Sequence, residues 1–332
     1  MLTTKPTLHA VAELAGVSIA SVSRVVNGIA AGSATEERVR NAILELGYEP
    51  NSAARALRVN ASEQICLALP DLSNPVYQSI IRGVQKGFKI SNYRLMLSPS
   101  LSSTEEVVKQ LKSLGRNYAD GLIINALVED EEIKDLIGNL RIPVVIIGNS
   151  FASLRLDTIQ VDSVRGAAMA VEYLNKNDRK QVLFLNGPWR TTPAALRKEG
   201  FLTAMKAAGV KNPQSHIANA KAFNPPAAVK ALEDVKNLNR YDAILCGNDF
   251  LAAGAIKFLS QKKIRVPDDI AVIGIDNTDL APLLTPTLTS VDFKAEYRGE
   301  LAAKFLLERL QNPGLPMRNS KIEPEIVIRE SA

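Results

Sequence analysis

Polar side chains follow several apolar, strand-like runs of this 332-residue chain. Asn149 follows VVIIG, Asn248 follows AILCG, and Asp276 follows IAVIGI, while Arg197 ends the WRTTPAALR segment that comes after QVLFLNGP. In open α/β sheets, ligands bind beyond the C-terminal ends of the strands. Amide, carboxylate and guanidinium groups together donate and accept hydrogen bonds. These positions are therefore candidates for the non-covalent binding of a polar small molecule.

The residues that usually carry catalysis are scarce. His9 and His216 are the only histidines, and Cys66 and Cys246 lie in apolar runs without a second cysteine or histidine at metal-ligand spacing. No G-x-x-x-x-G-K-[ST] or G-x-S-x-G motif occurs. We therefore expect no catalytic residue, no metal site and no cofactor, and we interpret both cysteines as buried, reduced thiols.

From residue 65 onward, apolar strands alternate with amphipathic helices. Strands are expected at ICLALP, RLMLSP, GLIIN, VVIIG, TIQVD, QVLFLNG, AILCGN and IAVIGID, and helices from Tyr77, Thr104 and Ser163, through Arg197 and from Phe250. Regular alternation of this kind predicts parallel sheets joined by crossover helices. The pattern restarts after TIQVD, so it predicts two α/β lobes with a binding cleft between them.

The first 48 residues show three short helical patterns and no strand pattern. AVAELAGVSIASVSRVVNG contains a helix, a turn with Gly16, and a second helix capped by Ser18. This order is typical of a helix-turn-helix, whose second helix presents its N-terminal residues to the DNA major groove. The third pattern, from Val39 to Leu46, is expected to begin at Thr35. The alternative is a small helical cap domain without DNA contacts.

Residues 50–62, PNSAARALRVNAS, predict a short helix that is only conditionally folded. Pro50 ends the preceding segment and Asn51 is a suitable cap, but AARAL gives about two turns and no amphipathic face. The alternative is a plain interdomain linker.

Charge and hydropathy limit the cellular context. The net charge is +5 and the sequence pI is about 9.1, which suits a polyanionic partner without requiring one. No apolar run of membrane-spanning length and no export signal is seen, so we expect a cytoplasmic protein with no membrane partner.

Three motifs occur in the order found in one protein family. AELAGVSIASVSRVVNG, ELGYEPNSAARAL and IRVPDDIAVIGIDN resemble the lac repressor family of bacterial transcription regulators. The resemblance implies an all-α helix-turn-helix headpiece and an α/β core of two doubly wound parallel-sheet lobes, similar to periplasmic sugar-binding proteins. The domains expected from it are a headpiece at 1–49, a hinge at 50–62, and a core at 63–332 with an N-lobe of about 63–161 plus 293–322 and a C-lobe of about 162–292 plus 323–332.

The resemblance also implies DNA contacts. Arg24 is suited to a phosphate or a guanine, Ile19 and Ala20 to thymine methyls, and Leu57 to a wedge in the minor groove. Glu36 stands where relatives often have an arginine, so one phosphate contact is in doubt. The full implied set is Ser18, Ile19, Ala20, Ser21, Ser23, Arg24, Asn27, Thr35, Asn51, Ala54, Arg55 and Leu57.

Effector contacts are implied in the core. The guanidinium, amide and carboxylate groups are joined by aromatic rings that can stack on C–H faces, which suits a sugar, a sugar derivative or a nucleoside. The implied residues are Tyr77, Asn149, Arg197, Phe223, Asn248, Asp276 and Phe293. Each has a structural alternative: Asp276 could cap a turn, Arg197 could lie on a helix surface, and the phenylalanines could belong to the core.

These observations favour a repressor that binds a pseudo-palindromic double-stranded DNA operator as a homodimer and responds to a small effector. A dimer is expected because no leucine-heptad tail for a tetramer follows EIVIRESA. The alternatives are a solute-binding protein of a transport system, which the core pattern alone would permit, and an enzyme.

Overall fold

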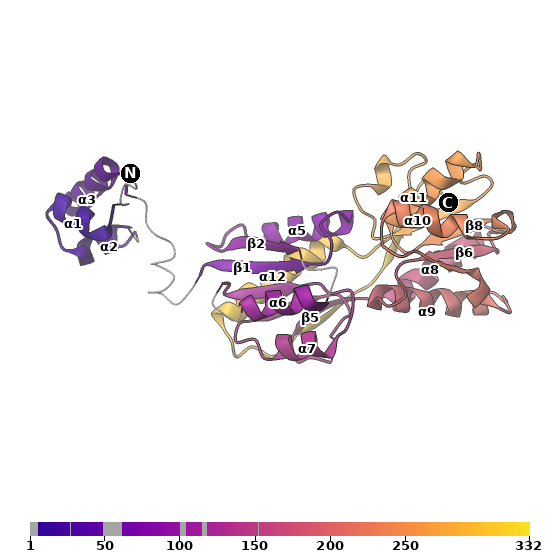
Figure 1. The fold of residues 1–332 in the computed structure, drawn as a ribbon, viewed down its shortest axis with the longest axis horizontal. Coiled ribbons are helices and arrows are strands. Elements are labelled where there is room, and N and C mark those ends of the chain that lie inside the picture. Colours follow the sequence, from indigo (N-terminus) through magenta and orange to yellow (C-terminus); the bar gives the residue numbers. More distant parts are fainter. Residues whose placement is uncertain (1–5, 27, 49–61, 100–103, 115–117, 152) are drawn as a thin grey trace. The chain divides into compact units, whose positions relative to one another are not determined.

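The computed structural model describes residues 6–26, 28–48, 62–99, 104–114, 118–151 and 153–332 (Figure 1). It contains two compact units, Met1–Ser62 and Glu63–Ala332. The helix expected within 50–62, together with Asn27, Asn51, Ala54, Arg55 and Leu57, lies outside the described residues.

The N-terminal unit contains a helix-turn-helix, as predicted. Helix α1 (Leu8–Ala15) is capped by Thr7, whose hydroxyl accepts from the Ala10 N–H, and ends at Gly16 with a left-handed φ of 62°. Helix α2 (Ile19–Val26) begins after Ser18, whose Oγ accepts from the Ser21 N–H at 3.1 Å. The two helix axes are bent by 107°, within the range typical of this motif.

The third helix begins earlier than predicted. Helix α3 (Ser33–Leu46) starts at Ser33, so Thr35 lies inside its first turn instead of opening it. Gly32 is the N-cap of α3; it has a φ of 86° and no side chain that could cap the helix. The Glu36 carboxylate accepts from the Ala31 N–H at 3.2 Å. Glu36 thus stabilises the turn that precedes α3.

The core of this unit is small and apolar. Val11, Ala12 and Ala15 of α1 pack against Val22 of α2 and Val39 of α3. Leu14 and Leu44, although apolar, are 45% and 79% exposed and do not belong to this cluster.

The first lobe of the core contains a six-stranded, fully parallel sheet in the order β11-β5-β4-β3-β1-β2. Helices α5 and α12 cover one face, and α6 and α7 cover the other (Figure 1). Its elements are β1 (Gln64–Leu69), α5 (Pro75–Phe88), β2 (Arg94–Pro99), α6 (Thr104–Leu114), β3 (Gly121–Ile124), α7 (Glu131–Gly138), β4 (Val144–Ile147), β5 (Asp157–Val161), α12 (Ala295–Gln311) and β11 (Asn319–Ile322).

The second lobe repeats this plan with the order β12-β10-β9-β8-β6-β7, in which only the edge strand β12 is antiparallel to its neighbour. Helices α8 and α9 lie on one face, and α10 and α11 lie on the other (Figure 1). Its elements are α8 (Ser163–Lys176), β6 (Val182–Asn186), α9 (Thr192–Ala207), β7 (Ile217–Asn219), α10 (Pro225–Glu233), β8 (Ala243–Cys246), α11 (Asp249–Gln261), β9 (Ala271–Ile275), β10 (Thr289–Asp292) and β12 (Glu325–Val327), with short 3-10 turns at Pro213–His216, Leu238–Arg240 and Ala281–Leu283. The predicted α/β class with two doubly wound lobes is confirmed.

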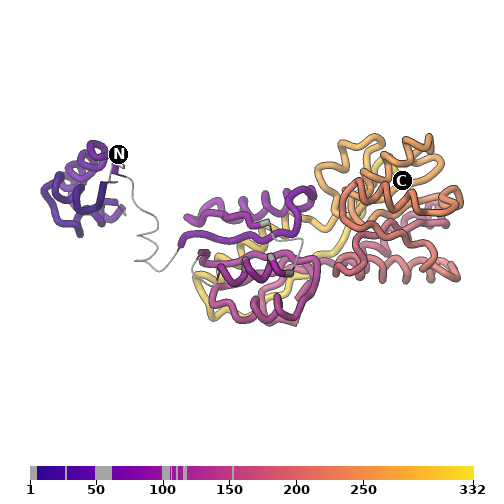
Figure 2. The backbone as a smooth tube through the Cα atoms, viewed as in Figure 1, coloured from indigo at the N-terminus to yellow at the C-terminus, as the bar shows by residue number. Residues whose placement is uncertain are grey.

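The chain passes between the lobes three times, after β5, after β10 and after β11 (Figure 2). One apolar cluster continues from the first lobe into the second and includes Val161 on one side and Phe293 on the other. Three segments of chain therefore join the two lobes.

Among the described residues, no single helix is long and apolar enough to cross a membrane. Only the pair α1 and α2 reaches the required length and composition, when the two helices on either side of their 107° bend are taken together.

Candidate functional site

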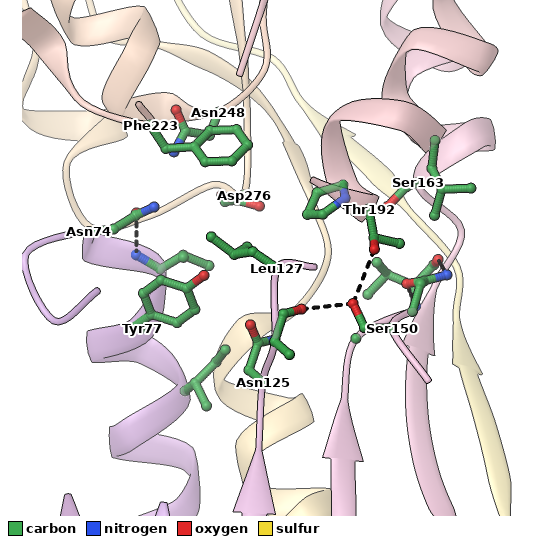
Figure 3. A pocket seen from close by; sticks show the side chains of 18 of the residues that line it. Asn74, Tyr77, Asn125, Leu127, Ser150, Ser163, Thr192, Phe223, Asn248 and Asp276 are labelled. Atoms are coloured by element: carbon green, nitrogen blue, oxygen red, sulfur yellow. Dashed lines mark hydrogen bonds between the residues drawn. The ribbon is translucent and has the colours of Figure 1, made fainter. Parts of the chain in front are cut away.

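A cavity that is partly open to solvent lies between the two lobes. Its walls are formed by segments that follow strands of both sheets, with Asn125 and Ser150 from the first lobe and Asn248 and Asp276 from the second (Figure 3). This is where ligands are expected in doubly wound sheets. Six of the seven residues expected at the effector site line it: Tyr77, Asn149, Arg197, Phe223, Asn248 and Asp276.

Arg197 and Asp276 form the charged centre of the cavity. Arg197 Nη2 donates to Asp276 Oδ1 at 3.3 Å, and Nη1 donates to the Gly247 carbonyl. Their side chains are only 9% and 7% exposed. Burial raises the pKa of the Asp276 carboxyl, and the nearby guanidinium groups of Arg197 and Arg298 oppose that rise. A buried carboxylate and guanidinium in this arrangement can accept from and donate to neighbouring hydroxyl groups.

The backbone at Asp276 is strained. Its φ is 106°, and that of Asn277 is 46°. Residues other than glycine seldom adopt such values, and they persist where the surrounding structure holds them. Directly behind, the fully buried Asp249 accepts from the Thr278 N–H at 2.6 Å and from the Ser290 hydroxyl at 2.5 Å. Burial and the neighbouring Asp276 raise the pKa of Asp249 to about 7.

The amide side chains differ in how far they are already engaged. Asn248 caps α11, with its Oδ1 accepting from the Leu251 N–H at 2.8 Å. Asn149 binds the Val161 backbone at both ends, since its Nδ2 donates to the carbonyl and its Oδ1 accepts from the N–H. Asn149 therefore braces β5 against the segment after β4, whereas Nδ2 of Asn248 donates to none of the described residues.

The two phenylalanines occupy different places. Phe223 lines the cavity, and its ring lies so close to Gly187 that a side chain there would collide with it. Phe293 does not line the cavity and is 1% exposed. Its ring centroid lies 5.9 Å from the Arg197 guanidinium carbon. The structure thus places Phe293 behind Arg197 as a packing surface instead of in contact with the cavity, because it belongs to the apolar cluster between the lobes.

The cavity also contains residues that the sequence analysis missed. Asn125 follows GLIIN, so its position after a strand could have identified it. Arg298 lies in the first turn of α12 and lines the wall beside Tyr77 and Ile80. No sequence signal distinguishes Arg298 from an ordinary helix residue.

Hydrogen bonds connect the two lobes beside the cavity. The Ser150 hydroxyl lies 3.2 Å from Thr192 Oγ1 (Figure 3), and the Thr192 N–H donates to the Leu127 carbonyl at 2.8 Å. Thr192 opens α9, so its N–H has no partner within that helix. The first lobe thus satisfies a backbone donor of the second. On the surface, Arg82 and Asp279 form a further ion pair across the lobes at 2.7 Å.

In the N-terminal unit, α2 turns Val22 inward and leaves its early residues accessible. Ser18, Ala20 and Arg24 are exposed, and Ile19 is 42% exposed. Ser21, Ser23 and Thr35 are half-buried. The residues expected to contact DNA and described by the structure thus lie at the start of α2, along it, and in the first turn of α3.

Neither reactive thiols nor a metal cluster is seen among the described residues. No group of three or more His, Cys, Asp or Glu side chains within these ranges is arranged to hold a metal ion. Cys66 and Cys246 are free and fully buried, and burial raises the pKa of both thiols, that of Cys66 to about 11. Such thiols are poor nucleophiles at neutral pH.

Comparison with known proteins connects both units to one family. Residues 7–51 match the profile "Bacterial regulatory proteins, lacI family", and residues 171–332 match "Periplasmic binding protein-like domain". The ribose operon repressor of Escherichia coli K12 is 31% identical over 330 residues, 98% of this chain and 99% of the relative. The HTH-type transcriptional repressor PurR of Photobacterium profundum is 31% identical over 328 residues, 98% of each.

Solved structures agree with these matches. The lac repressor bound to ONPG in the repressed state superposes with a TM-score of 0.86 at 25% identity, covering 99% of this chain and 100% of the other. The transcriptional regulator CelR in complex with cellobiose gives a TM-score of 0.75 at 26% identity over 98% and 100% of the two chains. With similarity over nearly its whole length and a matching helix-turn-helix, the chain belongs to the lacI family of DNA-binding bacterial transcription regulators.

Proposed function

We propose that this protein is a repressor that binds a pseudo-palindromic operator as a homodimer and is controlled by a sugar, a sugar derivative or a nucleoside in the cavity between its core lobes. Its action on DNA places it in the cytoplasm, and the proposal assigns it no catalytic step. Relatives at 31% identity are named as repressors, and a structural neighbour is a lac repressor dimer bound to operator.

The observation that carries this proposal is the composition of the cavity wall. Arg197, Asn248 and Asp276 come from one lobe, while Tyr77 and Asn125 come from the other. A polyol held by both sets of side chains favours one arrangement of the lobes over others. A ligand shifts such an equilibrium by its difference in affinity for the two arrangements. Effector contacts are proposed for the six predicted residues that line the cavity, and Phe293, which does not line it, is proposed to support its wall.

On the DNA side, the exposed start of α2 is the proposed reading surface. Ile19 and Ala20 present methyl groups suited to thymine, and Arg24 presents a guanidinium suited to a phosphate or to guanine. Leu57, with Asn51, Ala54 and Arg55, is proposed to contact the minor groove from the hinge.

The proposed division of labour assigns 1–49 to DNA, 50–62 to the hinge, and 63–332 to effector binding and dimerisation. Lobe closure would alter how the N-lobes of two subunits pair, and so bias the short hinge between ordered and disordered forms. Such a helix responds to a bias of a few kcal/mol, which is within the usual range of coupling between sites.

The test has two parts on the full-length protein. An operator is first selected from random double-stranded DNA, and its binding is measured by fluorescence anisotropy over a series of salt concentrations; specific, salt-dependent binding is expected. A thermal-shift screen of sugars, sugar derivatives and nucleosides then identifies ligands, since a ligand of the folded state raises the melting temperature. A hit is expected to change operator affinity.

Two tryptophan variants locate the ligand. Leu196 lines the cavity, so Leu196→Trp should abolish the ligand-induced thermal shift while operator binding is retained. Lys198 is exposed on the same helix, and Lys198→Trp should leave both properties unchanged. Ligand binding without any specific DNA binding would favour the solute-binding alternative, and turnover of the ligand would favour an enzyme.

A further inference from the structure

Arg298 is a buried cation that no carboxylate of the described residues contacts in an ion pair. The residue is 5% exposed, and within the described ranges its guanidinium makes no hydrogen bond and no ion pair. Its Nε is fully buried and unsatisfied. A charged group in such a position is expensive unless something neutralises it.

The position of Arg298 in α12 adds to the free-energy cost of burying its charge. It is the fourth residue of the helix, near an N-terminus where the free N–H groups already create a positive potential. The neighbouring Gly299 packs so closely on α5 that an added Cβ would collide with the Ile80 backbone. Helix α12 is therefore fixed against α5, and the backbone cannot carry Arg298 out to solvent without separating them.

The charges around the cavity do not balance. Among the described residues, Arg197, Arg298 and Asp276 are the Arg and Asp side chains that line it, so two guanidinium groups share one carboxylate. That carboxylate is already paired with Arg197 at 3.3 Å. Arg197 Nε, like that of Arg298, is buried without a hydrogen-bond partner.

Asp292 is the other carboxylate whose charge acts on Arg298; like Asp276, it opposes the lowering of the Arg298 pKa by burial, but it makes no ion pair with Arg298. Asp292 accepts from the Lys294 N–H at 2.6 Å and from Asn277 Nδ2 at 3.1 Å, and it does not line the cavity. Among the described residues, Arg298 therefore lines the cavity without a carboxylate in ion-pair contact with it.

We propose that the effector of this protein carries an anionic group, phosphate or carboxylate, on a polyol skeleton, and that Arg298 binds that group. The polyol hydroxyls contact Asp276 and Asn248, and the anion lies at the wall formed by α5 and α12, where Arg298 stands beside Tyr77. This rests on the proposed function, in which the cavity binds the effector. It narrows the ligand class to sugar phosphates and sugar acids.

The test uses full-length protein and matched ligands measured by isothermal titration calorimetry. Ribose is compared with ribose 5-phosphate, and glucose is compared with glucose 6-phosphate and gluconate, with inorganic phosphate as the anion alone. In at least one set, the anionic member is expected to bind at least tenfold more tightly than its neutral counterpart. The better of the phosphate and the acid identifies the source of the anion.

Variants assign the effect to Arg298. Arg298→Leu should weaken binding of the anionic ligand at least tenfold more than it weakens binding of the neutral sugar, and Arg298→Lys should restore part of the loss. Lys304 is an exposed cation on the same helix, so Lys304→Leu should change neither affinity. Without ligand, Arg298→Leu should melt at a higher temperature than the wild type, since it removes an unpaired buried charge.

Three results would overturn the inference. One is a neutral sugar that binds as tightly as its anionic counterpart, which would leave the proposed function intact. A second is an Arg298→Leu protein that binds the anionic ligand with wild-type affinity. The third is a protein that binds its operator but none of these sugars, which would also remove the sugar classes from the proposed function.

Discussion

Arg197 and Asp276, 79 residues apart in the chain, meet in the cavity with Nη2 donating to Oδ1 at 3.3 Å. Arg197 comes from the helix that follows β6, and Asp276 comes from the end of β9. The Phe293 ring packs behind the guanidinium, and the strained backbone of Asp276 holds its carboxylate in place. The pair is thus positioned before a ligand arrives, which reduces the entropy cost of binding.

Asp276→Asn should remove the charge of this pair while keeping an oxygen that accepts from Arg197. We expect effector affinity to fall at least tenfold, because a hydrogen bond to a charged group is worth about 1.5–3 kcal/mol. Operator affinity without effector should stay within twofold of the wild type. Calorimetry measures the first quantity, and anisotropy with labelled operator measures the second.

The control is Asp279→Asn. Asp279 follows the same strand, but its side chain is 70% exposed and pairs with Arg82 on the surface, where such pairs contribute little. An Asp276→Asn protein that binds the effector with wild-type affinity would remove Asp276 from the binding site.

Thr192 offers a test of coupling between the lobes. Thr192→Val keeps the shape of the side chain and the backbone bond to Leu127, but it removes the hydroxyl contact with Ser150. A neutral hydrogen bond contributes about 1 kcal/mol, so effector affinity should fall roughly fivefold. The change in operator affinity that saturating effector causes, relative to the operator affinity without effector, should become smaller in parallel.

Thr203→Val is the matched control, because Thr203 is an exposed threonine on the same helix. If both variants behave like the wild type, the Ser150–Thr192 contact does not stabilise the ligand-bound arrangement.

The sequence predicted the core strands because each is a short apolar run bounded by turn residues, as in AILCGN and IAVIGID. It missed β7, β10, β11 and β12, which have three or four residues each and depend on pairing with β6, β9, β5 and β10 respectively. No local pattern marks such strands, since their stability comes from distant neighbours. The sequence analysis also placed the start of α3 at Thr35, whereas the helix begins two residues earlier, at Ser33, after the turn at Gly32.

The residues that line the cavity could likewise be predicted only in part. Arg197, Asn248 and Asp276 could be predicted because residues after parallel strands converge at one edge. Arg298 could not, because its place depends on how closely α12 packs on α5, which brings a residue late in the chain beside Tyr77. The burial of Phe293 depends likewise on the apolar cluster formed between the lobes, which no local sequence pattern reveals.

Asp249 predicts a pH dependence of stability. Its pKa is about 7 in the folded protein against 3.8 for the ordinary carboxyl, so the folded state holds the proton more tightly than the unfolded state. Its contribution to stability is therefore present below about pH 4 and is lost as the pH rises to about 7. Asp249→Asn lacks this titration. The difference in urea midpoint, variant minus wild type, should therefore increase between pH 4 and 7 and stay level above pH 8.

Asp269 supplies a control of the opposite sign. Hydrogen bonds from Arg265 lower the pKa of this exposed carboxyl to about 2, so its contribution is present above about pH 4 and is lost as the pH falls. The difference between the wild type and Asp269→Asn should therefore be level from pH 5 to 8. A flat difference for Asp249→Asn across pH 4 to 7 would mean that Asp249 is ionised throughout.

The start of α2 separates folding from DNA reading. Ser18→Ala removes the acceptor for the Ser21 N–H, and loss of such a cap costs about 1 kcal/mol. The N-terminal unit of this variant should therefore lose protection of its amides against hydrogen exchange. Ile19 is 42% exposed and contributes little to the core, so Ile19→Ala should leave the amide protection unchanged and weaken operator binding several-fold.

Leu14 provides the comparison for Ile19, because it is an apolar side chain of similar exposure, 45%, on α1. Leu14→Ala should reduce operator affinity less than twofold. The sequence preference is the sharper measurement: if Ile19 contacts a thymine methyl, replacing that thymine by uracil should cost the wild type several-fold and cost Ile19→Ala nothing further. Equal sensitivity of both proteins to the replacement would show that another residue reads that base pair.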